Sequence, residues 1–156
     1  MKVKLEVASI NEMTEINMIQ KLAFKASYDK YKFCPAFEMT DDQIVTYLEK
    51  AFVYKIIKNE KIVGSIFIYK IGDNHYELDT ISIHPKYQDA GIGGEAIALI
   101  EKIYSDALVW SLSTPETDYR NRHFYEKIGY IQFDAEVINE HLTLIRYRKE
   151  VRLITT

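Results

Sequence analysis

The alternation of hydrophobic and polar positions predicts that the chain opens with a strand and continues into a helix. Apolar and polar residues alternate over 3–9, which is the period of a half-buried strand. Ser9 and Glu12 then match a capping box, which marks the start of a helix over about 11–27. The first two elements are therefore expected to be β and then α.

A second helix is predicted after a loop. The loop is expected around Pro35, because proline ends regular structure. Thr40 and Gln43 form a further capping box, and the helix that they start is expected to end near Lys50.

The next segment predicts a β-hairpin followed by a third strand. Two runs rich in β-branched residues over 52–70 are joined at Asn59 and Glu60, which is typical of a hairpin. The third strand is expected over 76–83, after a turn of Gly, Asp and Asn.

The third strand contains an irregularity. Leu78 and Ile81 lie three positions apart and break the two-residue period of apolar positions. A β-bulge near Asp79 and Thr80 would restore the period by inserting one unpaired residue. In the alternative interpretation, Leu78 faces a second layer of helices.

The remaining pattern completes a mixed α/β fold. A helix is expected to about Asp106, a nearly continuous apolar strand over 107–114, a short helix over 116–128, and a closing antiparallel pair over 129–134 and 141–151. The order β-α-α-β-β-β-α-β-α-β-β predicts a mostly antiparallel sheet flanked by helices. No repeat or linker interrupts it, so residues 1–156 are expected to form one domain.

Composition and charge narrow the function classes. The 156 residues are 47% hydrophobic and 28% charged, with a net charge of −3, which argues against nucleic-acid binding. No apolar run approaches the roughly 20 residues of a membrane helix, and no signal peptide is recognisable. A single cysteine, Cys34, cannot form an intramolecular disulfide, which favours a cytoplasmic location. No metal site is predicted.

The glycines before the third predicted helix raise a question of chemistry. Gly91, Gly93 and Ala96 match the dinucleotide pattern G-x-G-x-x-A. However, seven residues separate Ile83 from Gly91, and the downstream order is not that of a doubly wound sheet. The general physics remains, since glycines at a helix N-terminus let N–H groups converge on an anion. Alternatively, the glycines serve only a tight loop and close packing.

Two motifs together resemble one protein family. The first is Gln88-x-x-Gly91-x-Gly93 after a strand, and the second is "NRHFYEKIGY", which begins at Asn121. Both are similar to signatures of the GNAT superfamily of acyl-CoA-dependent N-acyltransferases. Their order and spacing also agree, and the predicted element order matches that fold over nearly the whole chain.

The resemblance implies how acetyl-CoA, the expected co-substrate, is bound. Backbone N–H groups of the loop would hold the pyrophosphate, the strand edge would pair with the pantetheine arm, the Ile83 N–H would contact the thioester oxygen, and Asn121 would hold the pantetheine. The implied binding residues are Ile81, Ser82, Ile83, Gln88, Asp89, Ala90, Gly91, Ile92, Gly93, Gly94, Asn121 and Tyr125. Asp89 departs from the usual small or basic residue, and Lys86, Arg120 and Arg122 are candidates to offset its charge.

The reaction would need a base and an acid. An alkylammonium with a pKa of about 10.4 must lose a proton before it attacks, so a base is needed. The resemblance implies an acidic base on the third strand, acting directly or through water, and the commoner family pattern favours Glu77 over Asp79. His75 stands just before them, and His84 is expected to be a loop residue. Tyr125 matches the family's general acid; the alternative is that it only packs.

The acceptor is expected to be a primary amine of a small molecule or peptide. The resemblance implies that the segment between the first two helices lines the acceptor pocket, and its aromatic and acidic residues suit a cation: Tyr28, Tyr31, Phe33, Phe37, Glu38, Asp41 and Asp42. Direct transfer is preferred to a Cys34 intermediate, because no histidine is near the cysteine in the sequence. A homodimer is possible. The rival function is a non-catalytic acyl-CoA sensor or scaffold of the same fold.

Overall fold

The computed structural model describes residues 2–88 and 90–151 and confirms the mixed α/β class. The strands are β1 (Lys4–Val7), β2 (Phe52–Lys58), β3 (Lys61–Gly72), β4 (His75–Ile83), β5 (Val109–Pro115), β6 (Ile131–Asn139) and β7 (Leu142–Glu150). The α-helices are α1 (Met13–Tyr31), α2 (Pro35–Glu38), α3 (Asp41–Val45), α4 (Ile92–Ile103) and α5 (Tyr119–Lys127). Short 3₁₀ turns occupy Ile10–Glu12, Thr46–Glu49 and Pro85–Tyr87.

The strands within the described residues form one sheet in the order β1-β2-β3-β4-β5-β7-β6. Every neighbouring pair is antiparallel except β4 and β5. The predicted hairpin turn is confirmed: Asn59 and Glu60 both have positive φ, as the two central residues of a tight primed turn require. The mostly antiparallel sheet is therefore the one that the sequence predicts.

Helices cover both faces of this sheet. The α4 helix packs Ile92, Ile97 and Ile100 against the larger core cluster, which includes Trp110 and Tyr147. On the opposite face, α1 and α3 pack on β2 and β3 through a second cluster of Ala8, Met13, Ile16, Ile44, Val53 and Phe67. No helix of the described part has the length and apolar character needed to span a bilayer.

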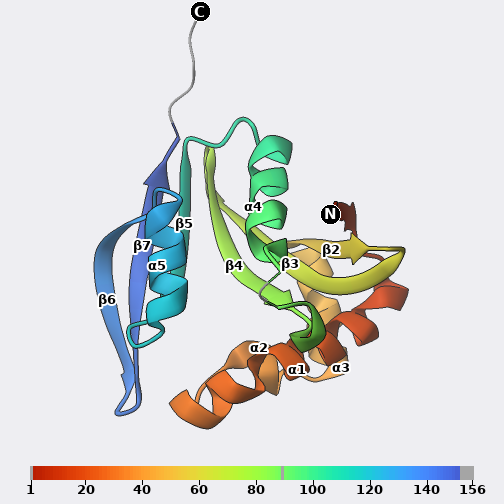
Figure 1. Ribbon diagram of the computed structural model, residues 1–156, viewed down its shortest axis with the longest axis horizontal. Helices are drawn as coiled ribbons and strands as arrows, with labels where there is room; N and C mark the ends of the chain where they lie inside the picture. Colours follow the sequence, from red (N-terminus) through yellow and green to blue (C-terminus); the bar gives the residue numbers. More distant parts are fainter. Residues whose placement is uncertain (1, 89, 152–156) are drawn as a thin grey trace, which may run out of the picture.

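The parallel strands β4 and β5 separate along their length. They pair only at their first residues, with His75, Tyr76 and Glu77 opposite Val109, Trp110 and Ser111. Figure 1 shows the two strands close together at that end and diverging toward α1, which crosses below them. Beyond Glu77, the edge of β4 that faces β5 therefore has no strand partner in the described chain.

Some elements extend beyond their predicted bounds. The α1 helix continues past residue 27 to Tyr31 and ends where Lys32 adopts a left-handed conformation with φ of 58°. The predicted loop at Pro35 contains the short helix α2, which has proline in its first turn, where the missing N–H costs nothing. The β6 strand continues to Asn139, because β7 offers partners as far as Leu142.

Candidate active site

The predicted bulge in β4 is confirmed and lies at Asp79. Thr80 pairs with Phe67 and Leu78 pairs with Ile68, which leaves Asp79 without a partner on β3. The inserted residue lets Leu78 and Ile81 both face the larger core cluster. The alternative explanation of the broken period is therefore not needed.

Downstream of the bulge, the backbone of β4 presents donors to its open edge. His84 donates its N–H to the carbonyl of Val63 at 2.8 Å, toward β3. Because successive residues of a strand point their N–H groups to opposite sides, the N–H of Ile83 faces away from β3. The Ile83 carbonyl accepts a hydrogen bond from Gln88 Nε2 at 3.0 Å, which agrees with that orientation.

Close backbone contact holds this part of β4 against β3. A Cβ on Gly64, which pairs with Ile83, would lie 2.2 Å from the carbonyl oxygen of Ser82, so only glycine fits at this position. The hydroxyls of Ser65 and Ser82, both buried, are 3.0 Å apart. The sequence analysis missed Gly64, although an isolated glycine inside a strand is itself a signal of close backbone approach.

The glycine loop continues into the N-terminus of α4. Gly91 precedes the helix with φ of 75°, a conformation that favours glycine. A Cβ on Gly91 would meet no atom within 4 Å, and one on Gly93 would meet only Ile81 at 4.0 Å. Packing therefore does not require these two glycines, but the positive φ of Gly91 fits the tight-loop alternative. A Cβ on Gly94 would meet the Phe124 ring at 3.5 Å, an ordinary van der Waals contact, so packing does not require this glycine either.

A pocket of about 460 Å³, here called the glycine-loop pocket, lies between this loop, α1 and α5. Its lining residues are Ala23, Phe24, Ser27, Ile81, Ser82, Ile83, Tyr87, Gln88, Gly91, Ile92, Gly93, Gly94, Ile97, Asp118, Arg120, Asn121, Phe124 and Tyr125. Ten of the twelve predicted binding residues are among them. Ala90 does not line the pocket, and Asp89 lies outside the described residues.

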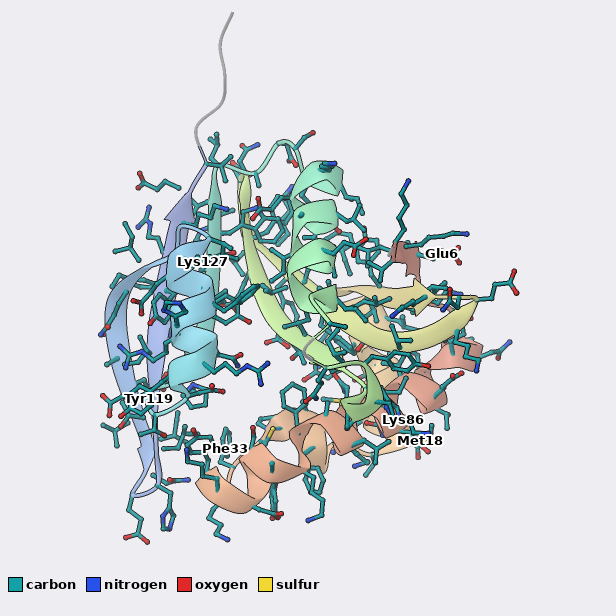
Figure 2. All side chains as sticks on the ribbon, in the orientation of Figure 1. Glu6, Met18, Phe33, Lys86, Tyr119 and Lys127 are labelled. Carbon is teal, nitrogen blue, oxygen red and sulfur yellow. The ribbon has the colours of Figure 1, made fainter. Side chains whose placement is uncertain are left out.

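A second pocket of about 460 Å³ occupies the space between β4 and β5 and is here called the inter-strand pocket. Its lining residues are Gln20, Phe24, Ser27, Tyr31, Phe33, Cys34, Pro35, Ala36, Met39, Tyr47, Phe67, Leu78, Asp79, Thr80, Ile81, Leu112, Ser113, Thr114, Pro115, Asp118, Asn121, Tyr125, Leu142 and Leu144. Phe33, labelled in Figure 2, lies where α1 ends, below α5.

The two pockets share one wall. Phe24, Ser27, Ile81, Asp118, Asn121 and Tyr125 line both of them. A group held in the glycine-loop pocket can therefore meet a second molecule held in the inter-strand pocket at this wall. Tyr125 stands there with only 7% of its surface exposed.

The electrostatics of Tyr125 keep its hydroxyl protonated. Burial, followed by the negative charge of Asp118, raises the pKa of Tyr125 to about 12. Asp118 caps α5 by accepting hydrogen bonds from the backbone N–H of Asn121 at 3.1 Å and from its Nδ2 at 3.0 Å. Asn121 thus lines both pockets, and Asp118 orients its amide. The sequence analysis singled out Asn121 but not Asp118.

The two candidate bases occupy different places. Asp79 lines the inter-strand pocket; burial raises its pKa, and a hydrogen bond from Thr80 at 3.0 Å opposes this. Glu77 lies two residues before the bulged Asp79 on β4 and lines neither pocket. Burial, followed by the negative charge of Asp79, raises the pKa of Glu77. Asp79 is therefore the carboxylate nearer the shared wall.

The predicted positive charges are divided among different sites. Arg120 lines the glycine-loop pocket, whereas Lys86 lines neither pocket and lies on the turn after β4 (Figure 2). Arg122 donates hydrogen bonds to the Tyr147 hydroxyl at 3.0 Å, the Glu116 carbonyl at 2.9 Å and Gln132 at 3.2 Å. It ties α5 to the sheet.

Only part of the predicted acceptor segment reaches the inter-strand pocket. Tyr31 and Phe33 line it, but the Tyr28 and Phe37 rings stack on each other, 4.7 Å apart. Glu38 accepts a hydrogen bond from the Cys34 N–H and Asp41 accepts one from Asn17, so neither carboxylate faces the pocket; Asp42 does not line it either.

The sequence analysis missed one face of α1. Gln20, Phe24, Ser27 and Tyr31 line the inter-strand pocket at spacings of four, three and four residues, which is one face of a helix. Gln20 is 1% exposed, and its Nε2 has no hydrogen-bond partner among the described residues. An unpaired buried donor costs about 1–3 kcal/mol.

Comparison with known proteins identifies relatives of this chain. The model of the acetyltransferase (GNAT) family matches residues 12–130. A Bacillus subtilis (strain 168) protein of uncharacterised function, YrkN, is 32% identical over 146 residues, which cover 90% of this chain and 78% of YrkN.

Solved structures share the fold at low sequence identity. The PaiA N-acetyltransferase of Thermoplasma acidophilum, in complex with coenzyme A, has a TM-score of 0.78 at 16% identity, covering 97% of this chain and 100% of that one. The ribosomal-protein-S18-alanine N-acetyltransferase of Escherichia coli has a TM-score of 0.74 at 12% identity, covering 99% and 97%.

Proposed function

The chain belongs to the acetyltransferase (GNAT) family, and on this basis we propose that it transfers the acetyl group of acetyl-CoA directly to a primary amine of a small molecule or peptide. The observation that carries the proposal is the wall that the two pockets share. The bound coenzyme A of the Thermoplasma acidophilum relative and the N-acetyltransferase names of both structural relatives agree with this assignment.

The glycine loop and β4 hold the acetyl donor. The N–H groups at the start of α4 have no helical acceptor, since the first helical bond runs from the Glu95 N–H to Gly91 O, and they bind the pyrophosphate. The open edge of β4 pairs with the pantetheine arm, and the Ile83 N–H donates to the thioester oxygen. Arg120 adds positive charge on the pocket wall. Acetyl-CoA supplies an acetyl group activated as a thioester.

Asp79 prepares the amine. An alkylammonium, with a pKa of about 10.4, must lose one proton before its nitrogen lone pair can form the new C–N bond. Asp79 takes that proton, directly or through a water, because it faces the inter-strand pocket. Glu77 lies next to this base on β4, and the negative charge of Asp79 contributes to the raised pKa of Glu77.

Tyr125 completes the transfer. As the C–S bond breaks, its hydroxyl donates a proton to the sulfur, so the released coenzyme is a neutral thiol. Asn121 on the same wall holds the pantetheine arm through the part of its amide that Asp118 does not use.

The thiol of Cys34 has no part in the proposed reaction. Cys34 lines the inter-strand pocket, but burial raises its pKa, which keeps the thiol protonated and a weak nucleophile at neutral pH. The acetyl group therefore passes to the amine without a protein-bound intermediate.

A thiol-release assay tests the proposal. Purified protein with acetyl-CoA is offered primary amines, and free thiol is measured together with the mass of each amine. We expect one thiol for each acetylated amine. A protein that binds acetyl-CoA tightly but releases no thiol with any amine would instead be a sensor or scaffold.

A further inference from the structure

Gln20 is the polar group of the inter-strand pocket that the proposed reaction does not use. It is 1% exposed on α1 and lines this pocket but not the glycine-loop pocket. Its Nε2 carries two N–H donors and has no partner among the described residues. Buried donors are nearly always satisfied, so an unpaired donor on a residue that lines a pocket suits an oxygen of a ligand.

Asn17, three residues earlier on α1, also has an unpaired buried atom, Oδ1, but it serves a structural contact. Its Nδ2 donates to the Met39 carbonyl at 3.1 Å and to Asp41 Oδ1 at 2.9 Å, which fixes the amide. Asn17 does not line either pocket. Gln20 is therefore the member of this pair that can reach a ligand.

The charges of the inter-strand pocket are of one sign. Asp79 and Asp118 line it, and no lysine, arginine or histidine does within the described residues. Such a pocket stabilises an ammonium group, whereas a free carboxylate would meet like charge and no cation. An acceptor with a free carboxylate is therefore disfavoured.

The rest of this pocket is mostly apolar. Phe24, Tyr31, Met39, Phe67 and Leu112 contribute to its walls. A second ammonium group lying against these side chains would lose hydration that contacts with their rings replace only in part. The body of the acceptor is therefore expected to be apolar.

We propose that the inter-strand pocket selects primary amines that have an apolar body and a neutral oxygen, such as an amide carbonyl, which accepts a hydrogen bond from Gln20, and that it discriminates against amines with a free carboxylate. This inference rests on the proposed acetyltransferase function and specifies its acceptor. The N-terminus of an apolar peptide is one amine of this class.

Three matched amines test the selection. They are alanyl-phenylalanine amide, alanyl-phenylalanine with its free carboxylate, and a phenylalkylamine of similar length without oxygen. Thiol release at saturating acetyl-CoA gives kcat/KM for each. We expect the amide to exceed both other amines by about tenfold or more, where tenfold corresponds to about 1.4 kcal/mol.

Gln20→Met tests the residue, because methionine has similar length but no donor. It should lower kcat/KM for the amide by about tenfold through KM and leave the oxygen-free amine unchanged. Gln20→Glu, which keeps the shape, should also abolish the preference for the amide over the oxygen-free amine. Gln132→Met removes a glutamine outside both pockets and should change neither value. Thermal unfolding of each variant shows whether it folds.

Several results would overturn the selection. One is an equal loss with both amines in Gln20→Met, which would give Gln20 a purely structural role. Others are a preference for the free acid or the oxygen-free amine, or acetylation of a polyamine while all three test amines fail. Those results would contradict the proposed acceptor selection but not the proposed acetyl transfer. If no amine releases thiol although acetyl-CoA raises the melting temperature, the proposed function fails as well.

Discussion

Replacing Tyr125 with phenylalanine separates its chemistry from its packing. The ring is buried and contacts the rings of Phe124 and Tyr130, with centroids 5.3 and 5.8 Å away. Tyr125→Phe keeps these contacts. Its hydroxyl has no hydrogen-bond partner among the described residues, so both the fold and the affinity for acetyl-CoA should change little.

The expected loss follows from the raised pKa. The pKa of Tyr125 is about 12, and a thiol has a pKa of about 8.5, so full proton transfer to a thiolate is uphill by about 3.5 units, or about 5 kcal/mol. Donation while the C–S bond is breaking is therefore favoured over protonation of an already free thiolate in a separate step. Loss of a general acid typically lowers kcat by about 10² to 10⁴.

Single-turnover measurement with a good acceptor is the appropriate assay, because slow product release can hide a chemical defect. Tyr125→Phe should lower the rate of acetyl transfer by that factor, leave KM unchanged, and keep the rise in rate with pH that the carboxylate base produces. Tyr130→Phe is the control, since Tyr130 is also buried but lines neither pocket. If Tyr125→Phe keeps more than half of the wild-type rate, Tyr125 is a packing residue and the acid is another group.

Further predictions concern the loop, the base and the strand contact. Acetyl-CoA at about 100 times its Kd should stabilise the fold by about 2.7 kcal/mol, which thermal unfolding would show as a Tm increase of about 5 to 10 °C. Gly91→Val should weaken acetyl-CoA binding in calorimetry, because the valine side chain would project into the pocket and resist the positive φ. The protein should stay folded, since a Cβ at this position meets no other atom within 4 Å. Unchanged affinity would make the loop merely structural. Burial raises the pKa of Asp79, so ionisation of this group costs stability as pH rises above its unfolded value of about 3.9. Asp79 is exposed to solvent in the open pocket, so this cost is small. Asp79→Asn should abolish most turnover yet raise Tm slightly at pH 7, with a gain that disappears near pH 3; a lower Tm at pH 7 would contradict this. Gly64→Ala should destabilise the fold by about 1–3 kcal/mol in urea unfolding, because its Cβ would meet a backbone carbonyl at 2.2 Å, and a neutral effect would refute that contact.

Local patterns were sufficient for the features that depend on few neighbours. The broken apolar period around Leu78 predicted the bulge, because side chains of a strand can reach a core only by alternation. Likewise, the spacing of Gly91 and Gly93 before an apolar run predicted a helix N-terminus with open N–H groups. Both features are fixed by backbone geometry within a few residues.

Features that depend on tertiary contacts were not predictable in the same way. Gln20 and Asp118 face a common pocket only because β4 and β5 separate beyond Glu77, and no local pattern encodes that separation. The choice between Glu77 and Asp79 as base had the same difficulty, since the bulge determines which of them faces the pocket. The α1 helix exceeded its predicted end because Tyr31 packs across the molecule, with its hydroxyl 3.0 Å from that of Thr117.

The fate of a labelled acetyl group tests the central claim most directly. One equivalent of acetyl-CoA labelled in the acetyl group is mixed with excess enzyme and an acceptor amine, and the label is then located in protein, amine and free acetate. The account predicts that the label passes to the amine nitrogen, with none retained on the protein. Label that stays on coenzyme A in the presence of every amine would contradict acetyl transfer, and label trapped on Cys34 would contradict direct transfer.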